Sequence, residues 1–339
     1  MAVSAFIKFG TGRVSEDASL HNLAAALRDP GAVMWIDIEK PEDEDYAILD
    51  EVFGFHPLAI EDSINRAQRP KIESYNHVGD ACQQGYFYMV IHGAEVPKAG
   101  EDKLSTEELD MFVSERYLIT IHDEPMSSLN VLLARARSDP RIVLDNGIDM
   151  LLHHVLDRLV DKYQPILEQL QDTLDELEEE AMNEPTPTLL TRITMKKREL
   201  LNLRRIIGPQ REVLAQLTRG EVPFIRESTR IYLRDVLDHL IRAVETIELY
   251  RDLVVGVRDI YMSSISNNLN QIMKTLTIIT VIALPMTVVT SFFGMNFNDE
   301  RVGGWGWLLN EPVGFWLSML FVLVVVGILL LLFRKRGWL

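Results

Sequence analysis

Two long uncharged runs near the C-terminus constrain this 339-residue chain more than any other feature. The first, TLTIITVIALPMTVVTSFFGMNFN, separates Lys274 from Asp299, and the second, PVGFWLSMLFVLVVVGILLLLF, separates Glu311 from Arg334. At about 1.5 Å per residue, each run as a helix crosses the roughly 30 Å hydrocarbon core of a bilayer. Two such runs so close together argue against buried helices of a soluble protein, so both are predicted to be transmembrane helices.

The basic residues that flank the two runs predict the orientation of the chain. Lys274 precedes the first run, Arg334, Lys335 and Arg336 follow the second, and the loop between them holds only Arg301. Basic residues are retained on the cytoplasmic side, whereas acidic residues count for little. We therefore expect a multi-pass protein of the cell (inner) membrane with both termini in the cytoplasm.

The charge is divided unevenly along the chain. The whole chain has 34 basic and 50 acidic residues, a net charge of −16, whereas residues 1–273 alone have 29 and 47, a net of −18. This acidity favours cationic partners over nucleic acid. The one cysteine cannot form an internal disulfide, which suits a reducing compartment. The sequence contains no phosphate-binding loop, HExxH or nucleophile motif, so we expect neither an enzyme nor a cofactor.

The N-terminal part has the pattern of a mixed α/β domain. Short β-branched and aromatic runs at 33–38, 86–92 and 111–122 predict strands, and residues 43–53 predict a helix before a turn at Gly54 and Pro57. The predicted fold class is therefore an α+β membrane protein, with a cytoplasmic α/β domain, a long helical stalk or funnel, and two C-terminal transmembrane helices.

From about residue 145 the pattern is helical only. Apolar residues recur at steps of three and four from 152 to 177, with a kink expected at Pro165, and a second helix is predicted over 189–217. A third begins near Phe224 and has no proline before Pro285, so it is predicted to continue into the first span. The predicted organisation is: 1–144, α/β domain; 145–273, stalk; 274–298, first span; 299–311, external loop; 312–333, second span; 334–339, cytoplasmic tail.

The first span has a small and polar stripe at helical spacing. Its members are Asn270, Met273, Thr277, Thr280, Leu284, Thr287, Ser291 and Gly294. Membrane threonines also bond to their own backbone, and small residues also mark helix packing, so the stripe alone leaves pore and packing open. Its run across the whole span favours a water-filled pore, which one helix can enclose only by assembling in a ring. Met273 and Leu284 would then be apolar constrictions.

The first span ends in Gly294, Met295 and Asn296. Glycine and asparagine there also suit a helix C-cap, because both tolerate left-handed backbone angles. The functional interpretation is a ring of amide and carbonyl oxygens at the external mouth. Neutral oxygens suit a hard divalent cation bound through its waters.

Several motifs in order resemble the CorA magnesium transporter family over almost the entire chain. The most specific is FGMNF at 293–297, at the end of the first of two C-terminal spans. The tail RKRGWL, the run VMWIDIE, the segment FGFHPLAIEDSINRAQRPKIE at 53–73 and YLRDVLDH at 232–239 support it. The resemblance implies a homopentameric channel in which the first span lines the pore.

The resemblance also implies roles for individual residues. Gly294, Met295 and Asn296 would form the outer selectivity filter, with Asn296 facing the hydrated ion. The pore positions implied by the family or by the stripe are Asn270, Met273, Leu276, Thr277, Thr280, Leu284, Thr287 and Ser291. Asp235 matches a family aspartate that binds a regulatory divalent ion between subunits, and Glu95 is the nearest match for its partner.

Regulation and ion choice follow as hypotheses. Divalent ions that bridge acidic subunits would hold the ring closed, and their loss would open it, which is negative feedback by cytoplasmic Mg²⁺. Mg²⁺ would be both transported and regulatory, with Co²⁺ and Ni²⁺ as further ions. The loop NDERVGG departs from the Met-Pro-Glu segment of many members. Two alternatives stay open, a proton-coupled zinc transporter of the ZntB type and a membrane-tethered sensor or scaffold.

Overall fold

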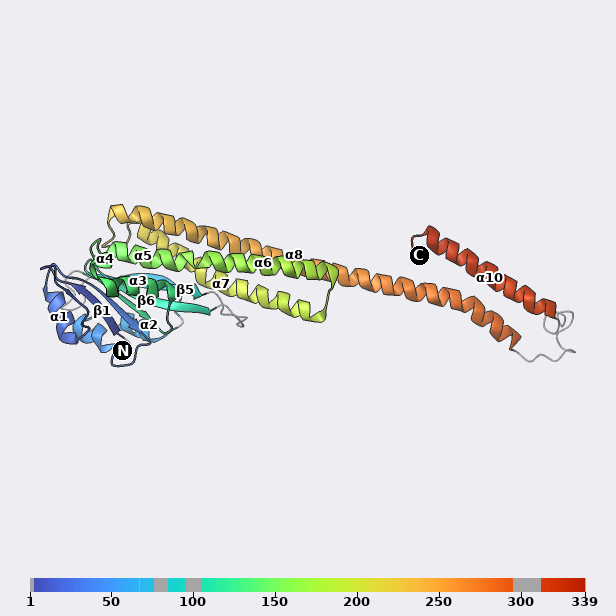
Figure 1. The fold of residues 1–339 in the computed structure, drawn as a ribbon, viewed down its shortest axis with the longest axis horizontal. Coiled ribbons are helices and arrows are strands. Elements are labelled where there is room, and N and C mark those ends of the chain that lie inside the picture. The colour runs from blue at the N-terminus through green and yellow to red at the C-terminus, as the bar shows by residue number, and fades with distance from the viewer. Residues whose placement is uncertain (1–2, 67, 76–84, 96–104, 295–311, 339) are drawn as a thin grey trace. The chain divides into compact units, whose positions relative to one another are not determined.

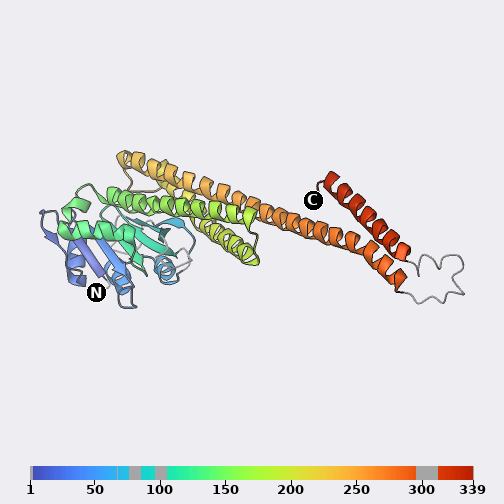
Figure 2. The same ribbon diagram turned by 45° about the vertical axis from the view of Figure 1, so that its right-hand side comes forward.

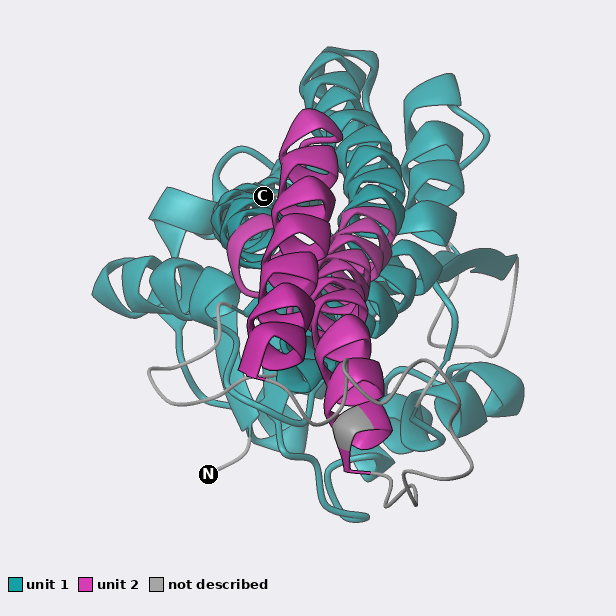
Figure 3. Cartoon of the chain, turned by 90° about the vertical axis from the view of Figure 1, so that its right-hand side faces the viewer, with its two compact units in different colours: residues 1–180, 186–258 teal, residues 181–185, 259–339 magenta. Residues whose placement is uncertain are grey.

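The computed structural model describes residues 3–66, 68–75, 85–95, 105–294 and 312–338. The chain divides into two compact units, which Figure 3 shows in two colours. The first unit comprises residues 1–180 and 186–258, and the second comprises residues 181–185 and 259–339. Each unit is described by itself below.

A seven-stranded sheet forms the centre of the first unit. Its strands are β1 (Val3–Lys8), β2 (Val14–Ser15), β3 (Val33–Glu39), β4 (Lys71–Tyr75), β5 (Tyr86–Glu95), β6 (Ser105–Val113) and β7 (Tyr117–His122). Their spatial order is β2-β1-β3-β7-β6-β5-β4. Only the β3–β7 pair in this sheet is parallel, and every other neighbouring pair is antiparallel.

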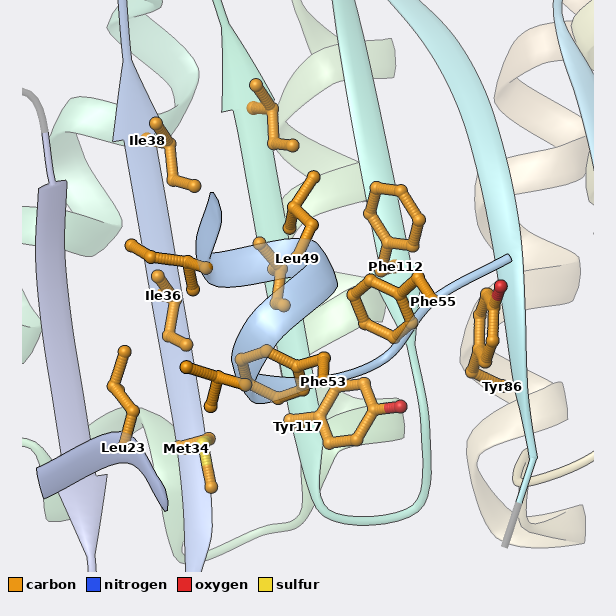
Figure 4. Packing of buried hydrophobic residues seen from close by; sticks show 14 of the residues in the cluster. Leu23, Met34, Ile36, Ile38, Leu49, Phe53, Phe55, Tyr86, Phe112 and Tyr117 are labelled. Carbon is orange, nitrogen blue, oxygen red and sulfur yellow. The ribbon is translucent and has the colours of Figure 1, made fainter. Parts of the chain in front are cut away.

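One face of the sheet packs on α1 (Leu20–Arg28), the turn η1 (Ile48–Val52) and α2 (Pro57–Ile64). Side chains alternate between faces along a strand, so Ile36 and Ile38 reach this cluster together. Figure 4 shows the aromatic side of the cluster, where Phe55 stacks on Phe112 with ring centroids 4.4 Å apart. Tyr86 lies 4.5 Å from Phe55, so aromatic rings continue the cluster onto β5.

The other sheet face lies under α3 (Ser127–Ser138), α4 (Arg141–Leu144) and α5 (Ile148–Asp161). It buries a polar chain on β3 and β7, in which Trp35 Nε1 donates to Thr120 Oγ1 at 3.1 Å. The same hydroxyl donates to Asp37 Oδ1 at 2.5 Å, and His122 Nε2 lies 3.3 Å from that oxygen. Burial alone would lower the pKa of His122, but Asp37 raises it.

The α/β domain is confirmed, with corrections to its elements. The run 111–122 is two strands, because Ser114–Arg116 turns the chain between β6 and β7. The helix predicted over 43–53 is only the π-type turn η1, since Gly54 ends it with φ +62°. Pro57, predicted to lie in a turn, is instead the first residue of α2. Proline suits this position because the first N–H groups of a helix have no partner within the helix, so the missing N–H costs nothing.

Three long helices follow the sheet, and Figures 1 and 2 show them side by side along much of their length. They are α6 (Tyr163–Asn183), α7 (Pro187–Arg219) and α8 (Glu227–Phe293). The helical run is interrupted at Lys162, between α5 and α6, three residues before the predicted kink at Pro165. Pro165 has no N–H for the carbonyl four residues earlier, so the interruption falls in the turn before it.

Two contacts tie these helices to the rest of the first unit, one to the sheet and one to α5. Tyr163 is fully buried on α6, where its hydroxyl donates to the His92 carbonyl at 2.5 Å and accepts from Gln210 Nε2 at 2.9 Å. Asp149 near the start of α5 accepts from Arg226 Nε at 2.8 Å and from Thr229 Oγ1 at 2.6 Å. Burial opposes ionisation there, but these hydrogen bonds lower the pKa of Asp149.

The second unit holds the two candidate membrane spans. The C-terminal part of α8 and α10 (Pro312–Lys335) are long and apolar enough to cross a membrane. Within the part of the chain that the structure describes, the apolar window of α8 has no buried residue. The predicted continuity of the stalk helix into the first span is confirmed, because α8 is one helix from Glu227 to Phe293.

Candidate pore and ion sites

The predicted pore stripe lies on an exposed surface of α8. Met273, Leu276 and Leu284 are each more than half exposed, and Thr280 and Thr287 are exposed as well. The other faces also expose large apolar residues, including Ile279 and Val288. A single copy in water would leave this surface uncovered, so it requires lipid, other helices or both.

The threonines of the stripe hydrogen-bond to their own helix. Thr277 Oγ1 donates to the Met273 carbonyl at 2.7 Å, and Thr280 Oγ1 donates to the Leu276 carbonyl at 2.8 Å. Thr287 Oγ1 donates to the Ala283 carbonyl at 3.0 Å. This back-bonding is the usual arrangement in membrane helices and suits both the packing and the pore interpretation.

Pro285 lies inside the span without ending the helix. It removes one backbone donor, so the carbonyl of Val281, four residues earlier, has no helical partner from that position. At the C-terminal end of α8, Gly294 N donates to the Thr290 carbonyl at 2.9 Å. Met295 and Asn296, the other members of the predicted selectivity filter, lie outside the described residues.

The stalk positions Asp235 on an exposed side of α8, with about 72% of its side chain exposed. His239 one turn later lies between two carboxylates, with Nε2 3.9 Å from Asp235 and Nδ1 3.5 Å from Asp161. His239 was not among the predicted site residues, although its spacing of four residues from Asp235 places both on one helix face. Asp235 is therefore accessible to an ion in the single chain.

Glu95, the nearest match for the partner of Asp235, ends β5 and binds the start of α3. Ser127 N donates to one carboxylate oxygen at 2.8 Å, and Ser127 Oγ donates to the other at 2.9 Å. Both oxygens of Glu95 thus serve as a cap for α3. A glutamate that binds the first turn of a helix thirty-two residues away is not recognisable from sequence spacing.

A buried cluster of ionisable residues on β5 and β6 has no signature in the sequence pattern. Asp110 is fully buried, accepts from Tyr88 Oη at 2.5 Å and forms an ion pair with Arg66. Burial raises the pKa of Asp110 to about 8, although Tyr88 and Arg66 oppose the shift. Burial lowers the pKa of His92 to about 4, and its Nε2 lies 3.7 Å from Glu108.

Metal-ligand geometry in a single copy is sparse. The described residues contain no group of three or more histidine, cysteine, aspartate or glutamate side chains placed to hold a metal ion. His153 and His154 do approach each other, with ring centroids 5.1 Å apart, but His153 stacks on Tyr232. These ring contacts fit a structural role for the two histidines.

Taken with the two spans and the long shared helix, this arrangement defines an α-helical membrane protein that carries a large α/β domain. Comparison with known families gives its relatives. Residues 30–335 match the model of the CorA-like Mg²⁺ transporter protein family. The chain belongs to this family.

Relatives from a bacterium and an archaeon cover most of the chain. It is 34% identical over 315 residues to the cobalt/magnesium transport protein CorA of Thermotoga maritima, covering 92% of this chain and 85% of that protein. It is 28% identical over 308 residues to the protein of the same name from Methanocaldococcus jannaschii, covering 90% of this chain and 91% of the relative.

Solved structures agree with this membership. The complete CorA magnesium transporter from M. jannaschii superimposes with a TM-score of 0.79 at 26% identity, covering 99% of this chain and 98% of the other. The ZntB cytoplasmic domain from Vibrio parahaemolyticus has a TM-score of 0.58 at 16% identity, covering 79% of this chain and 100% of that one. The second similarity shows a shared fold alone, so the magnesium branch is better supported than the zinc branch.

Proposed function

We propose that the chain assembles with copies of itself into a ring whose first spans enclose a pore for divalent cations, chiefly Mg²⁺. The observation that carries this proposal is the unbroken α8, which bears an exposed polar stripe through an otherwise apolar span. Five copies is the number that the family resemblance implies. Transport of magnesium and cobalt by the named relatives supports the choice of ions.

The ion path is built from neutral groups. Asn296 and Gly294 would offer amide and carbonyl oxygens at the external mouth, where a hydrated Mg²⁺ can bind without losing its waters. Thr280 and Thr287 would line the middle of the path, with Leu284 between them as an apolar constriction. Such a constriction blocks ions by excluding water until it widens. Both termini would lie on the cytoplasmic side of the cell (inner) membrane, where the acidic residues 1–273 would attract cations.

Closure by cytoplasmic Mg²⁺ is the regulatory part of the proposal. Asp235 is exposed on the stalk and, like Asp161, lies within 4 Å of His239, so a divalent ion bound there between copies would relieve repulsion between carboxylates. Glu95 remains the proposed partner, and in that case the ion must compete with Ser127 for its oxygens. Asp235→Ala is expected to raise the Mg²⁺ concentration that closes the pore, and unchanged closure would remove Asp235 from the mechanism.

Reconstituted full-length protein tests the transport itself. Liposomes with an internal indicator should take up Mg²⁺, together with Co²⁺ or Ni²⁺, without a proton gradient, and Asn296→Ala should remove most of that flux. Zn²⁺ uptake that requires a proton gradient would favour the ZntB type. No uptake of any ion would leave the membrane-tethered sensor or scaffold. Intact flux in the Asn296→Ala protein would contradict the proposed filter.

A further inference from the structure

The charge on the helical hairpin of α6 and α7 is segregated by helix. The sequence of α6 contains seven acidic residues and no basic ones, whereas α7 contains eight basic and two acidic residues. A hairpin of this kind could neutralise itself through ion pairs between its two helices. In the described residues, which include both helices in full, Arg192–Glu180 is the one ion pair that joins them.

Most of the remaining charge points to solvent instead. On α6, exposed acidic residues recur at steps of four, three and four, which places them on one helix face. We call them the acidic strip: Glu168, Asp172, Asp175 and Glu179. None of the four forms an ion pair among the described residues, and α6 meets its neighbours through apolar residues such as Leu170 and Leu174.

The exposed surface of α7 has the opposite sign. Its members, the basic strip, are Lys197, Arg198 and Arg205, and they surround Leu201, whose side chain is 42% exposed. The three basic side chains form no ion pair in the part of the chain that the structure describes. Arg204 on the flank pairs with Glu248 of α8 at 3.1 Å, which shows that α7 forms such pairs where an acid is near.

The two strips lie at the same level along the hairpin. Glu180 faces Arg192 near the hairpin turn, and Tyr163 faces Gln210 near the opposite end. Because antiparallel helices advance equally per residue, interpolation places Asp175 level with Lys197, and Glu168 level with Arg205. Copies related by a rotation about an axis along the hairpin are not shifted along it, so the strips of neighbouring copies also meet at one level.

We propose that the basic strip of one copy binds the acidic strip of the next copy. This inference rests on the ring of the proposed function and names a surface that holds it together. A contact between two different patches is heterologous, and such contacts close into rings when the rotation allows. It also explains how copies with a net charge of −16 associate, because unlike strips meet while the remaining acidic surface stays apart.

Charge reversal in the full-length protein tests this pairing. One variant reverses the basic strip (K197E, R198E and R205E), a second reverses the three members of the acidic strip that lie level with it (E168K, D172K and D175K), and a third carries all six changes. The control reverses three exposed arginines on α3 and α4 (R135E, R137E and R141E), which change the charge equally. Dissociation of the oligomer in detergent is followed by mass measurement on dilution at low salt.

Each one-sided variant should dissociate at a concentration at least about tenfold higher than the unaltered protein, since three attractive pairs become repulsive in every contact. The six-fold variant should return to within about threefold of the unaltered protein, because its strips are complementary again. Raising the salt should weaken the unaltered oligomer and strengthen the one-sided variants. Simple damage to the hairpin would instead make the six-fold variant the worst.

Several outcomes would overturn the pairing. Unchanged dissociation of both one-sided variants would do so, and so would an equal loss in the α3–α4 control or a six-fold variant without recovery. Loss in the basic-strip variant alone would indicate another acidic partner for α7, such as anionic lipid. Mg²⁺ flux of the unaltered protein is measured in parallel. If the protein transports Mg²⁺ but charge reversal in the strips does not change dissociation of the oligomer, the pairing is contradicted and the proposed function is not.

Discussion

In the first unit, buried carboxyl groups such as those of Asp110 and Asp149 are held by arginine and hydroxyl partners from distant parts of the chain. In the second unit, the hydroxyl groups of Thr277 and Thr280 bond only four residues back, on a surface that nothing in one copy covers. The packing of the first unit is therefore determined by contacts within the unit itself. The surface of the second unit must be covered by lipid and by other copies. Mutations in the first unit should therefore change the free energy of unfolding, whereas mutations in the second unit should change ion flux.

The largest expected loss of stability is at Asp149. Asp149→Ala removes the buried acceptor for Arg226 and Thr229 and leaves the fully buried Thr229 hydroxyl without that acceptor, at a cost of about 3 kcal/mol in the free energy of unfolding. The stabilisation also requires ionised Asp149: because its pKa is lowered on folding, it is present above pH 3.8 and lost as the pH falls below that value.

Denaturant unfolding of the full-length protein in detergent measures this effect. Asp145→Ala is the matched control, since Asp145 is exposed and its ion pair among the described residues is with the part-exposed Lys8, and it should cost less than about 0.5 kcal/mol. Equal losses in the two variants would show that the corner between α7 and α8 does not depend on the buried carboxylate.

The next effect depends on pH and concerns His92. Its pKa is lowered to about 4 on folding, so its contribution to stability is present above pH 6.5 and lost as the pH falls towards 4. His92→Gln should therefore flatten the dependence of unfolding on pH between 6.5 and 4 by about 2 kcal/mol. The exposed His21, replaced in the same way, serves as the control, and an unchanged slope in the His92 variant would contradict the assignment.

A smaller loss is expected for a single buried hydroxyl. Tyr163→Phe removes the hydrogen bond to the His92 carbonyl and the one from Gln210 Nε2, which keeps only its bond to the Ile206 carbonyl, at a cost of about 1.5 kcal/mol. Tyr250→Phe removes a hydroxyl that donates to Gln171 Oε1 at 3.0 Å on a part-buried surface, and should cost about 0.5 kcal/mol. If the two variants unfolded at the same midpoint, the hydroxyl of Tyr163 would not be a link between sheet and stalk.

The smallest effect on unfolding, below about 0.5 kcal/mol, is expected at Leu284, because its side chain is 62% exposed in the single copy. Leu284→Asn should nevertheless increase Mg²⁺ leak into liposomes at Mg²⁺ concentrations that close the pore, since a polar constriction holds water. Leu284→Met, which keeps an apolar side chain, should not leak. A Leu284→Asn protein that unfolded much more easily but did not leak Mg²⁺ would contradict this difference between the two units.

The parts of the fold with regular periodicity were predictable from the sequence. The helices predicted over 189–217 and from about 224 into the first span correspond to α7 and α8, and the strand at 33–38 corresponds to β3. The turn between β6 and β7 was not found, because Ser114–Arg116 carries no glycine or proline. No strand was predicted at β1 or β4, since their short runs are interrupted by lysine, serine or glutamate.

The candidate sites divide in the same way. Asp235 and the pore stripe could be named because helical spacing relates residues close in sequence. The Asp110–Arg66 and Asp149–Arg226 pairs join residues 44 and 77 positions apart, and only the tertiary fold brings them together. The filter roles of Met295 and Asn296 stay predictions, as does a divalent ion bound by both Asp235 and Glu95.

The back-bonded threonines of α8 have a consequence for the sign of the ion. Thr277, Thr280 and Thr287 each give their one hydroxyl proton to a carbonyl of the preceding turn, so what each turns outward is an oxygen lone pair. A chloride ion beside these side chains would find no proton to share, whereas the hydrogens of a hydrated cation's water shell would find a column of acceptors. In the proposed pore, the wall would then discriminate against anions without a single charged residue within the bilayer.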